Sequence, residues 1–379
     1  MQAVLSAASP LVDGPALWRA AVEGTTAWWS AVDERPERAL GDPLRWAGHS
    51  ARRRRPSWAT PHDVALATPL LRLRDFRLGE AREVVPTLVF PPQAGHDSCI
   101  VDFAPDQSQM LAIRKAGLAN AWTLDWVGAT RATAGATVED YLAAVDRAVS
   151  HIGAERLNLV GDCQGGWLAT IWAALHPERA NTLTIAGAPV DFHAGEPLIH
   201  AWLRTLAPGG DLAFYRALVA LGGGVLSGTT MLSSFVALKP EEELTKQLGL
   251  LSQLDDVAAL ARFHRFEDWY KHTQDIPGAF YLWIVERLFR DNALVRGELE
   301  VGGERVDLRA IDAPLFLVAG ARDHITPPAQ VWALADATST PQDRVMRRLS
   351  SGGHLGLFMA HEALREHWPP VLAGIRALS

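Results

Sequence analysis

From residue 86 onward, short apolar runs alternate with amphipathic segments along the chain. The apolar runs predict strands at residues 87–90, 121–126, 157–160, 182–186 and 314–319, and a further short strand is expected at 344–349. Between them, apolar positions at helical spacing predict helices at 106–117, 138–152, 165–175, 328–335 and 361–378. Strands that alternate with helices pair in parallel and place helices on both faces of the sheet. The pattern therefore predicts an α/β fold with a mostly parallel central sheet.

This alternation stops between residues 191 and 303, where the chain is mostly helical in pattern and contains a flexible glycine run. An insertion of this size between strands of an α/β sheet predicts a cap, or lid, over the carboxyl ends of the strands, where ligands bind. Residues 1–80 predict helical and irregular structure. The expected organisation is thus an N-terminal extension (1–80), a core formed by 81–190 and 304–379, and a cap subdomain (191–303).

A nucleophile motif follows the third predicted strand. Its sequence is Gly-Asp-Cys-Gln-Gly-Gly-Trp at residues 161–167, and an Ala/Leu-rich helix comes next. An apolar strand that runs through Gly-x-nucleophile-x-Gly into a helix is typical of a nucleophile elbow, in which a tight turn raises one reactive side chain above the sheet. The small residues suit a strained turn, and the helix N-terminus favours negative charge on the sulfur of Cys163. We therefore expect a thiol nucleophile on an α/β-hydrolase fold.

Two later residues complete a catalytic triad in the chain order that this fold requires. Asp323 follows the apolar strand at 314–319, and His354 lies in a glycine-rich loop after the strand at 344–349. His354 is expected to accept the thiol proton of Cys163, while Asp323 fixes the imidazole tautomer and supports its positive charge. His324 is the weaker alternative base, because it is adjacent to the acid and would have to fold back on it.

Backbone N–H groups near the thiol predict an oxyanion hole. One donor is expected from Gln164, and the second from the loop after the first predicted strand. Pro91 and Pro92 have no N–H, so Gln93 is the candidate and Ala94 the alternative. Further candidates for the pocket or for support of the triad are Trp167, His324, Asp268 and His272. The last two lie at helical spacing in the cap, and neither they nor other residues suggest a metal-ligand set or a cofactor site.

Composition limits the classes of partner. The 379-residue chain has a formal net charge of −7, which argues against nucleic acid as the main partner. No apolar stretch approaches the ~20 residues of a membrane-spanning helix. Two cysteines provide no disulfide framework, and the N-terminus lacks the pattern of a secretory signal, so we expect a cytoplasmic protein. The basic run at 52–55 is expected to be a solvated linker, with an anionic ligand as the alternative.

Several motifs resemble the polyhydroxyalkanoate synthase family, and most closely the catalytic subunits of its short classes III and IV. They lie in order at residues 161–166, 186–192, 298–308, 323–327 and 352–356. The resemblance implies that the catalytic triad polymerises (R)-3-hydroxyacyl groups from coenzyme A thioesters and releases coenzyme A. It also implies a second, non-catalytic synthase subunit or a homodimer, contact with the growing polyester chain, and association with polymer granules.

Two alternatives remain open from the sequence. Intracellular polyhydroxyalkanoate depolymerases share the order of Cys, Asp and His along the chain. The sequence at residues 353–358 also resembles the corresponding segment of that family. The loop at 93–98 lacks the pattern expected of synthases, and Trp167 replaces a smaller residue. A hydrolase that uses the thiol on polyester or thioester is therefore the alternative function. A third hypothesis is a catalytically silent protein that binds granules through its Trp-rich N-terminus.

Overall fold

The computed structural model describes residues 13–77, 84–195 and 197–379. The chain forms two compact units, each built from two separate stretches of sequence. The helical unit comprises the described part of residues 1–56 together with 228–273. The sheet unit comprises residues 57–227 and 274–379.

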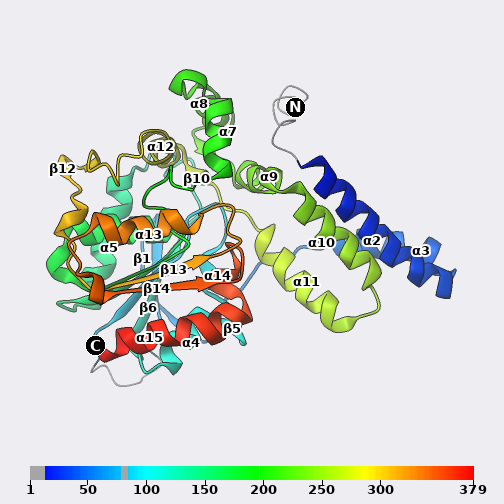
Figure 1. Cartoon of the computed structure of the whole chain (residues 1–379), viewed down its shortest axis with the longest axis horizontal. Helices are drawn as coiled ribbons and strands as arrows, with labels where there is room; N and C mark the ends of the chain where they lie inside the picture. The colour runs from blue at the N-terminus through cyan, green and yellow to red at the C-terminus, as the bar shows by residue number, and fades with distance from the viewer. Residues whose placement is uncertain (1–12, 78–83, 196) are drawn as a thin grey trace. The chain divides into compact units, whose positions relative to one another are not determined.

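An eight-stranded sheet lies at the centre of the sheet unit (Figure 1). Its strands, in spatial order, are β1 (Asp63–Ala67), β2 (Leu71–Asp75), β6 (Ala121–Trp126), β3 (Thr87–Phe90), β7 (Leu157–Asp162), β8 (Ala180–Ala186), β13 (Leu315–Gly320) and β14 (Val345–Ser350). From β6 to β14 all neighbours are parallel, whereas β1 and β2 form an antiparallel hairpin, and β2 pairs antiparallel with β6. The predicted mostly parallel α/β sheet is confirmed.

Helices cover both faces of this sheet. Figure 1 shows α4 (Gln109–Lys115) and α15 (Trp368–Ala377) on one face, and α5 (Val138–Ile152) and α13 (Pro328–Ala337) on the other. The helix α6 (Gln164–Leu175) directly follows β7. Helix α5 shows how local sequence sets the ends. The side chain of Asp140 accepts the N–H of Thr137 in a capping box, and Gly153 ends the helix at a φ of 72°.

Shorter elements complete the sheet unit. They are α7 (Leu198–Leu206), α8 (Ala213–Leu221), α12 (Gly278–Trp283) and α14 (Gly356–Met359), with the short pairs β4 (Asp102–Ala104) and β5 (Gln107–Ser108), β9 (Val225–Leu226) and β10 (Ile276–Pro277), and β11 (Glu300–Val301) and β12 (Glu304–Arg305). Single 3₁₀ turns span Ser98–Val101, Pro177–Arg179, Pro208–Gly210, Leu308–Ala310 and Gln342–Arg344, and π-helical turns span Ile284–Arg290 and Ala363–His367.

The helical unit contains five described helices: α2 (Gly14–Glu34), α3 (Arg38–Ala51), α9 (Gly228–Leu238), α10 (Pro240–Ser252) and α11 (Val257–Tyr270). Helices α2 and α10 pack so closely that a Cβ on Gly24 would lie 2.4 Å from the Cβ of Leu248. The buried carboxylate of Glu267 pairs with Lys246 and Lys271 at 2.5 and 2.6 Å. Two cations offset the cost of burying this charge.

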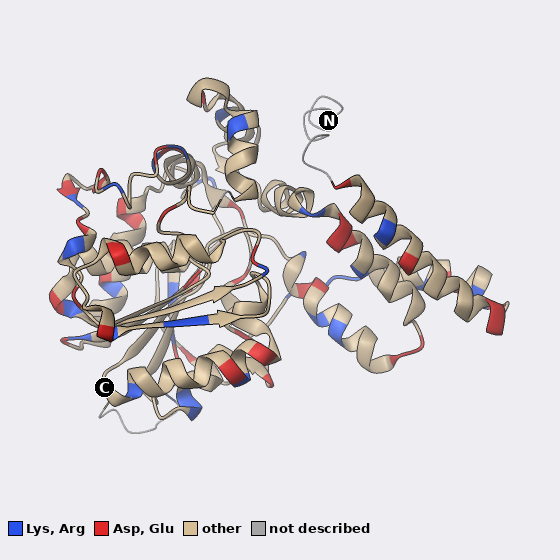
Figure 2. Ribbon diagram, in the orientation of Figure 1, with Lys and Arg blue, Asp and Glu red and all other residues tan. Residues whose placement is uncertain are grey.

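Two features differ from the sequence prediction. Residues 1–80 were expected to be helical and irregular, but they also contain the β1–β2 hairpin. Residues 191–303, which predict one cap, are divided, since 228–273 pack with the N-terminal helices and the remainder belongs to the sheet unit. A lid function of these segments stays a prediction. Figure 2 shows acidic and basic positions interspersed along the helices of each unit. Among the described helices, none has the length and apolarity needed to cross a bilayer.

Candidate active site

Cys163 occupies the turn between β7 and α6. Its φ of 50° and ψ of −120° are strained values for a residue with a side chain. Backbone hydrogen bonds fix this conformation on both sides. The N–H of Cys163 donates to the carbonyl of Ala186 at 2.9 Å, and its carbonyl accepts from the N–H of Gly166 at 2.9 Å. The backbone therefore forms the sharp strand-to-helix turn of a nucleophile elbow.

The glycines of the motif allow three backbone segments to meet at this turn. A Cβ on Gly161 would lie 2.4 Å from the Cα of Gly166, and one on Gly165 would lie 1.9 Å from the carbonyl oxygen of Phe90. Both distances are below any real contact of a Cβ with backbone. The turn needs glycine at these two positions because of close packing, in addition to the strain at Cys163.

The imidazole of His354 is joined to the carboxylate of Asp323. Nδ1 of His354 lies 2.7 Å from Oδ2 of Asp323, and both side chains are buried. The other oxygen of Asp323 accepts the N–H groups of Ile325 and Thr326 at 2.9 and 2.8 Å. These bonds leave the carboxylate one orientation, so Asp323 holds the imidazole in place and selects the tautomer with a proton on Nδ1.

His354 also interacts with the sulfur of Cys163. Burial alone would lower the pKa of His354, but the charges of Asp323 and Cys163 and its hydrogen bonds to both raise it well above the ordinary value. The imidazole passes close to Gly187, whose φ is 53° and where a Cβ would lie 3.3 Å from Cε1 of His354. The structure thus brings together the three predicted triad residues. Their catalytic roles belong to the proposal below.

A narrow pocket begins one residue beyond the thiol. It is lined by the predicted oxyanion residues Gln93 and Gln164 and by Trp126, Gly165, Trp167, Leu168 and Phe280. Trp167 is buried, and its ring centroid lies 6.1 Å from those of Phe280 and Trp283. The predicted pocket candidate Trp167 therefore forms part of an aromatic wall.

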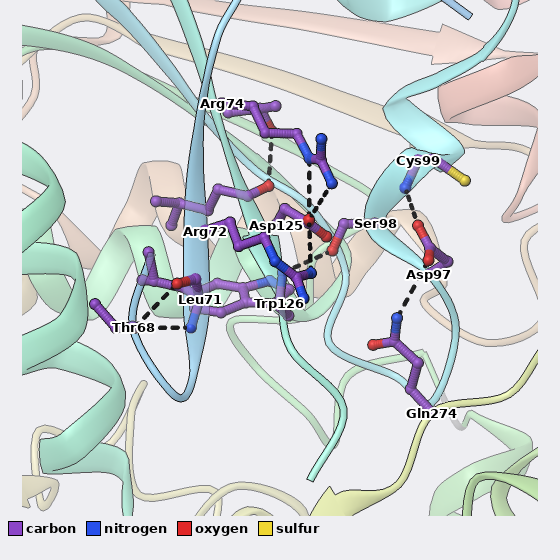
Figure 3. Close-up of polar contacts among 12 residues, drawn as sticks. Thr68, Leu71, Arg72, Arg74, Asp97, Ser98, Cys99, Asp125, Trp126 and Gln274 are labelled. Carbon is purple, nitrogen blue, oxygen red and sulfur yellow. Dashed lines mark hydrogen bonds and ion pairs between the residues drawn. The ribbon is translucent and has the colours of Figure 1, made fainter. Parts of the chain in front are cut away.

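The loop that carries Gln93 and Ala94 is tied to its surroundings by the contacts drawn in Figure 3. The Oγ of Ser98 accepts the N–H of Trp126 at 3.0 Å. Asp97 accepts the N–H of Cys99 at 3.0 Å and the Nε2 of Gln274 at 3.3 Å. Gln274 also donates its own N–H to the carbonyl of Gly95 at 2.8 Å. A residue within the segment predicted as the cap is therefore hydrogen-bonded to the predicted oxyanion loop.

The second thiol has a different environment. Cys99 is buried, and burial, followed by the nearby charge of Asp97, raises its pKa well above the ordinary value. A thiol that resists ionisation is a poor nucleophile. Cys163, at the helix N-terminus beside His354, is therefore the candidate for chemistry.

The remaining predicted residues lie elsewhere. His324 is half-buried beside Asp323, while His354 occupies the position of the base. Asp268 and His272 belong to the helical unit, where Asp268 accepts the N–H of Arg54 at 2.8 Å and pairs with Arg52 at 3.4 Å. That carboxylate already has cationic and backbone partners within its unit. The predicted supporting roles of these residues stay predictions.

Two buried or anchoring carboxyl groups were missed by sequence reasoning. Asp162, inside the elbow motif, is fully buried and bonded to Gln109. Glu362 accepts from Ser350 and Ser351, which begin the loop of His354. The position of Asp162 next to the nucleophile in the sequence could have indicated its place in the site. No feature of the sequence around Glu362 indicates its contact with the loop of His354.

Glu362 also belongs to a group of possible metal ligands. Its potential ligand atoms lie within 4.8 Å of those of Glu366 and His367. The Oε1 of Glu362 already contacts the imidazole of His367 at 2.8 Å, in addition to its bonds with the loop of His354. These contacts explain the cluster as an anchor for that loop.

Comparison with solved structures agrees with the fold. A carboxylesterase of the thaumarchaeon Nitrososphaera gargenis aligns over 84% of this chain and 98% of its own, with a TM-score of 0.51 and 14% identity. This likeness shows the α/β-hydrolase fold and carries no information on substrate. The predicted fold class is confirmed.

Curated relatives agree with the resemblance of the sequence motifs. The "Poly(3-hydroxyalkanoate) polymerase subunit PhaC" of Allochromatium vinosum is 28% identical over 72% of this chain and 75% of its own. The protein of the same name from Synechocystis is 29% identical, over 72% and 73%. An uncharacterized Rhizobium meliloti protein is 31% identical over 74% of this chain but 40% of its own. The predicted similarity to a polyhydroxyalkanoate-synthase-like enzyme is therefore confirmed.

A family model matches residues 71–375, which include every strand of the sheet except β1 and all three residues of the triad. By this match, the chain belongs to the family described as "Protein of unknown function (DUF3141)".

Proposed function

We propose that this protein is an acyltransferase that polymerises (R)-3-hydroxyacyl groups from coenzyme A thioesters into polyhydroxyalkanoate. The observation that carries the proposal is the contact of His354 with both Asp323 and the sulfur of Cys163 on a strained elbow. The names of the polymerase relatives support the choice of substrate. A thiol suits repeated acyl transfer, because exchange between two thioesters is nearly balanced in free energy.

In the first half-reaction, Cys163 takes the acyl group. Nε2 of His354 accepts the thiol proton, and the sulfur attacks the thioester carbonyl carbon. The N–H groups of Gln164 and Gln93 are proposed to stabilise the oxyanion of the tetrahedral intermediate. Its carbon–sulfur bond to coenzyme A then breaks, and the leaving thiolate receives the proton from His354. Asp323 stabilises the imidazolium during both transfers.

In the second half-reaction, the hydroxyl at the end of a growing chain attacks the acyl group on Cys163. His354 accepts the hydroxyl proton, the ester bond forms, and the carbon–sulfur bond to Cys163 breaks. The proton returns to the sulfur, so each cycle adds one unit and restores the thiol. Water in place of the chain hydroxyl would make the same site a hydrolase, which is the alternative that the α/β-hydrolase fold accommodates.

Product analysis separates the two functions. The purified full-length chain is mixed with (R)-3-hydroxybutyryl-coenzyme A, and free thiol, polymer and free hydroxyacid are measured. We expect thiol release with polymer gain in the wild type and in Cys99→Ala, and neither in Cys163→Ala. Free acid without polymer would establish the hydrolase instead. No thiol release from a folded protein, also after addition of a polymerase partner subunit, would refute both.

The proposed function includes an assembly with other subunits and a place in the cell. A homodimer or a second, non-catalytic subunit and a granule surface are proposed from the resemblance alone. Sedimentation of the active sample, with and without polymer, measures each directly. A monomer that is active and stays in solution would contradict them without affecting the chemistry.

A further inference from the structure

Gln93, which lines the pocket together with Gln164, uses only one end of its side-chain amide in hydrogen bonding. Gln93 is 2% exposed, and its Nε2 donates to the hydroxyl of Tyr141 at 3.0 Å. Its Oε1 is buried and has no hydrogen-bond partner among the described residues. Because a tyrosine hydroxyl can donate or accept, one end of the amide is occupied in either orientation, and the other end stays free.

A second amide has the same property in the same pocket. The Oε1 of Gln164 is buried and also has no partner within the described part of the chain. Gln93 and Gln164 both line the pocket, and in this structure it is too narrow for a free water molecule. A buried polar group without a hydrogen-bond partner destabilises the folded chain. Two such groups in one pocket are places where a ligand can supply hydrogen bonds.

The other residues that line the pocket indicate the polarity of the rest of the ligand. The walls are mainly aromatic and aliphatic, since Trp126, Trp167, Leu168 and Phe280 line the pocket together with the two glutamines. The ring of Phe280 stacks on Tyr141 at 4.1 Å, so the wall on that side is continuous with the partner of Gln93. The pocket therefore suits a short apolar chain that carries one polar group.

An alcohol is the polar group that fits both amides. A hydroxyl donates its single proton to the free oxygen of one amide, and it accepts from the other amide when that amide is turned to present its NH2 group. In a 3-hydroxyacyl group this hydroxyl is separated from the reacting carbonyl by two carbon–carbon bonds. Gln164 follows Cys163 directly in the sequence, so its side chain starts close to the thiol that attacks this carbonyl.

We propose that the side-chain amides of Gln93 and Gln164 bind the 3-hydroxyl of the acyl group and select hydroxyacyl over plain acyl substrates. This inference rests on the proposed function of the site and adds a determinant of its specificity. Entry of the chain requires Trp167 or Phe280 to shift, because the pocket is narrow. The hydrogen bonds gained offset the cost of this movement when the hydroxyl is present.

Kinetics with two substrates test the inference. Coenzyme A release is compared for (R)-3-hydroxybutyryl- and butyryl-coenzyme A in the wild type, Gln93→Met and Gln164→Met. Methionine keeps the length of the side chain and removes the amide. We expect the ratio of kcat/KM for the two substrates to fall about tenfold in each variant, the effect of one hydrogen bond. The exposed Gln253→Met is the matched control and should keep the wild-type ratio.

A binding measurement keeps the inference testable without turnover. Protection of Cys163 from iodoacetamide is titrated with 3-hydroxybutyramide and with butyramide. The hydroxyl should lower the half-protecting concentration in the wild type but not in Gln93→Met, with circular dichroism confirming that the variant is folded. Equal protection by both amides in the wild type would overturn the inference, even if polymerisation is observed. Preferential protection without turnover would support it and reject the proposed reaction.

Discussion

The Nε2 of Gln109 donates to Oδ1 of Asp162 at 3.2 Å, and each side chain retains one buried oxygen that has no partner among the described residues. A proton on Oδ2 of Asp162 would satisfy both oxygens, because it can be donated to Oε1 of Gln109. Burial raises the pKa of Asp162 to about 8, although the bond from Gln109 and the charge of His354 lower it in part. At neutral pH a neutral carboxylic acid therefore lies directly before Cys163.

We expect the free energy of unfolding of Asp162→Asn, relative to that of the wild type, to increase as pH rises. The pKa of Asp162 is about 8 in the folded chain against the ordinary 3.8, so folding binds a proton between these values. Stability from this group is therefore complete below about pH 4 and is lost as pH rises toward 8, by up to about 1.4 kcal/mol per unit. Asparagine keeps both hydrogen bonds and does not titrate.

Urea unfolding at pH 5 and pH 8 measures this difference. The difference in free energy of unfolding between Asp162→Asn and the wild type should favour the variant more at pH 8 than at pH 5. The exposed Asp336→Asn should show no such trend. An equal loss of stability by Asp162→Asn at both pH values would show that the carboxyl is ionised throughout.

Removal of Glu362 should slow the chemical step. Its carboxylate accepts from Oγ of Ser350 at 2.7 Å and from the N–H of Ser351 at 3.1 Å. Burial opposes ionisation, but these bonds and His367 lower the pKa of Glu362 to about 2, so the anchor persists at all working pH values. Without it the loop of His354 gains freedom, and kcat should fall about tenfold, with little change in KM.

The matched control for this variant is Glu366→Ala, an exposed carboxylate on the π-helical turn that follows Glu362. A rise in KM with unchanged kcat in Glu362→Ala would assign Glu362 to substrate binding instead. Stability supplied by Glu362 should persist above its ordinary pKa of 4.5 and be lost as pH falls toward 2.

Gly165→Ala should disrupt the elbow. A Cβ there would lie 1.9 Å from the carbonyl oxygen of Phe90, and only movement of the backbone relieves that overlap. We expect a loss of more than about 3 kcal/mol in stability, or failure to fold. Gly249→Ala provides the comparison, because no atom lies within 4 Å of a Cβ at this site in α10. It should be neutral or stabilise by about 0.5–1 kcal/mol. Similar melting temperatures for the two variants would contradict the packing argument.

The two thiols should differ strongly in alkylation. Cys163 is half-buried and interacts with His354, whereas Cys99 is buried and its pKa is raised. Iodoacetamide at pH 7.5 is therefore expected to add one carbamidomethyl group per native chain, located at Cys163 by peptide mass spectrometry. Native Cys163→Ala should stay unmodified, and unfolding in urea should expose Cys99 in both proteins. Rapid labelling of Cys99 in the native state would contradict the structure.

The parallel part of the sheet could be predicted because its strands from β3 to β13 are apolar runs flanked by helical sequence, whereas β14 carries two arginines and was placed by its position in the alternation. The hairpin β1–β2 was missed, although Leu and Arg alternate along β2 with the period of a strand. The half-buried Arg74 of β2 donates to Asp125 of β6 at 2.6 and 2.9 Å, and this pair has no local signal because its carboxylate lies on another strand.

The triad residues were found from chain order, because the fold dictates where the acid and base follow the nucleophile. The link between Asp162 and Gln109 could not be found in this way. Both residues are polar, and polar residues are usually exposed. They become buried partners, with a raised pKa for Asp162, only when β7 and α4 pack together. The packing of α2 on α10 likewise joins segments far apart in the chain and has no local signal.

The composition of the helical unit from two distant stretches sets an order for folding during synthesis. Helices α2 and α3 leave the ribosome before their packing partners at 228–273, which follow only after residues 57–227 have been translated. Until then the faces of α2 and α3 that later become buried stay open to solvent and to chaperones. The emerging chain must keep its first helices unassembled while much of the sheet is made.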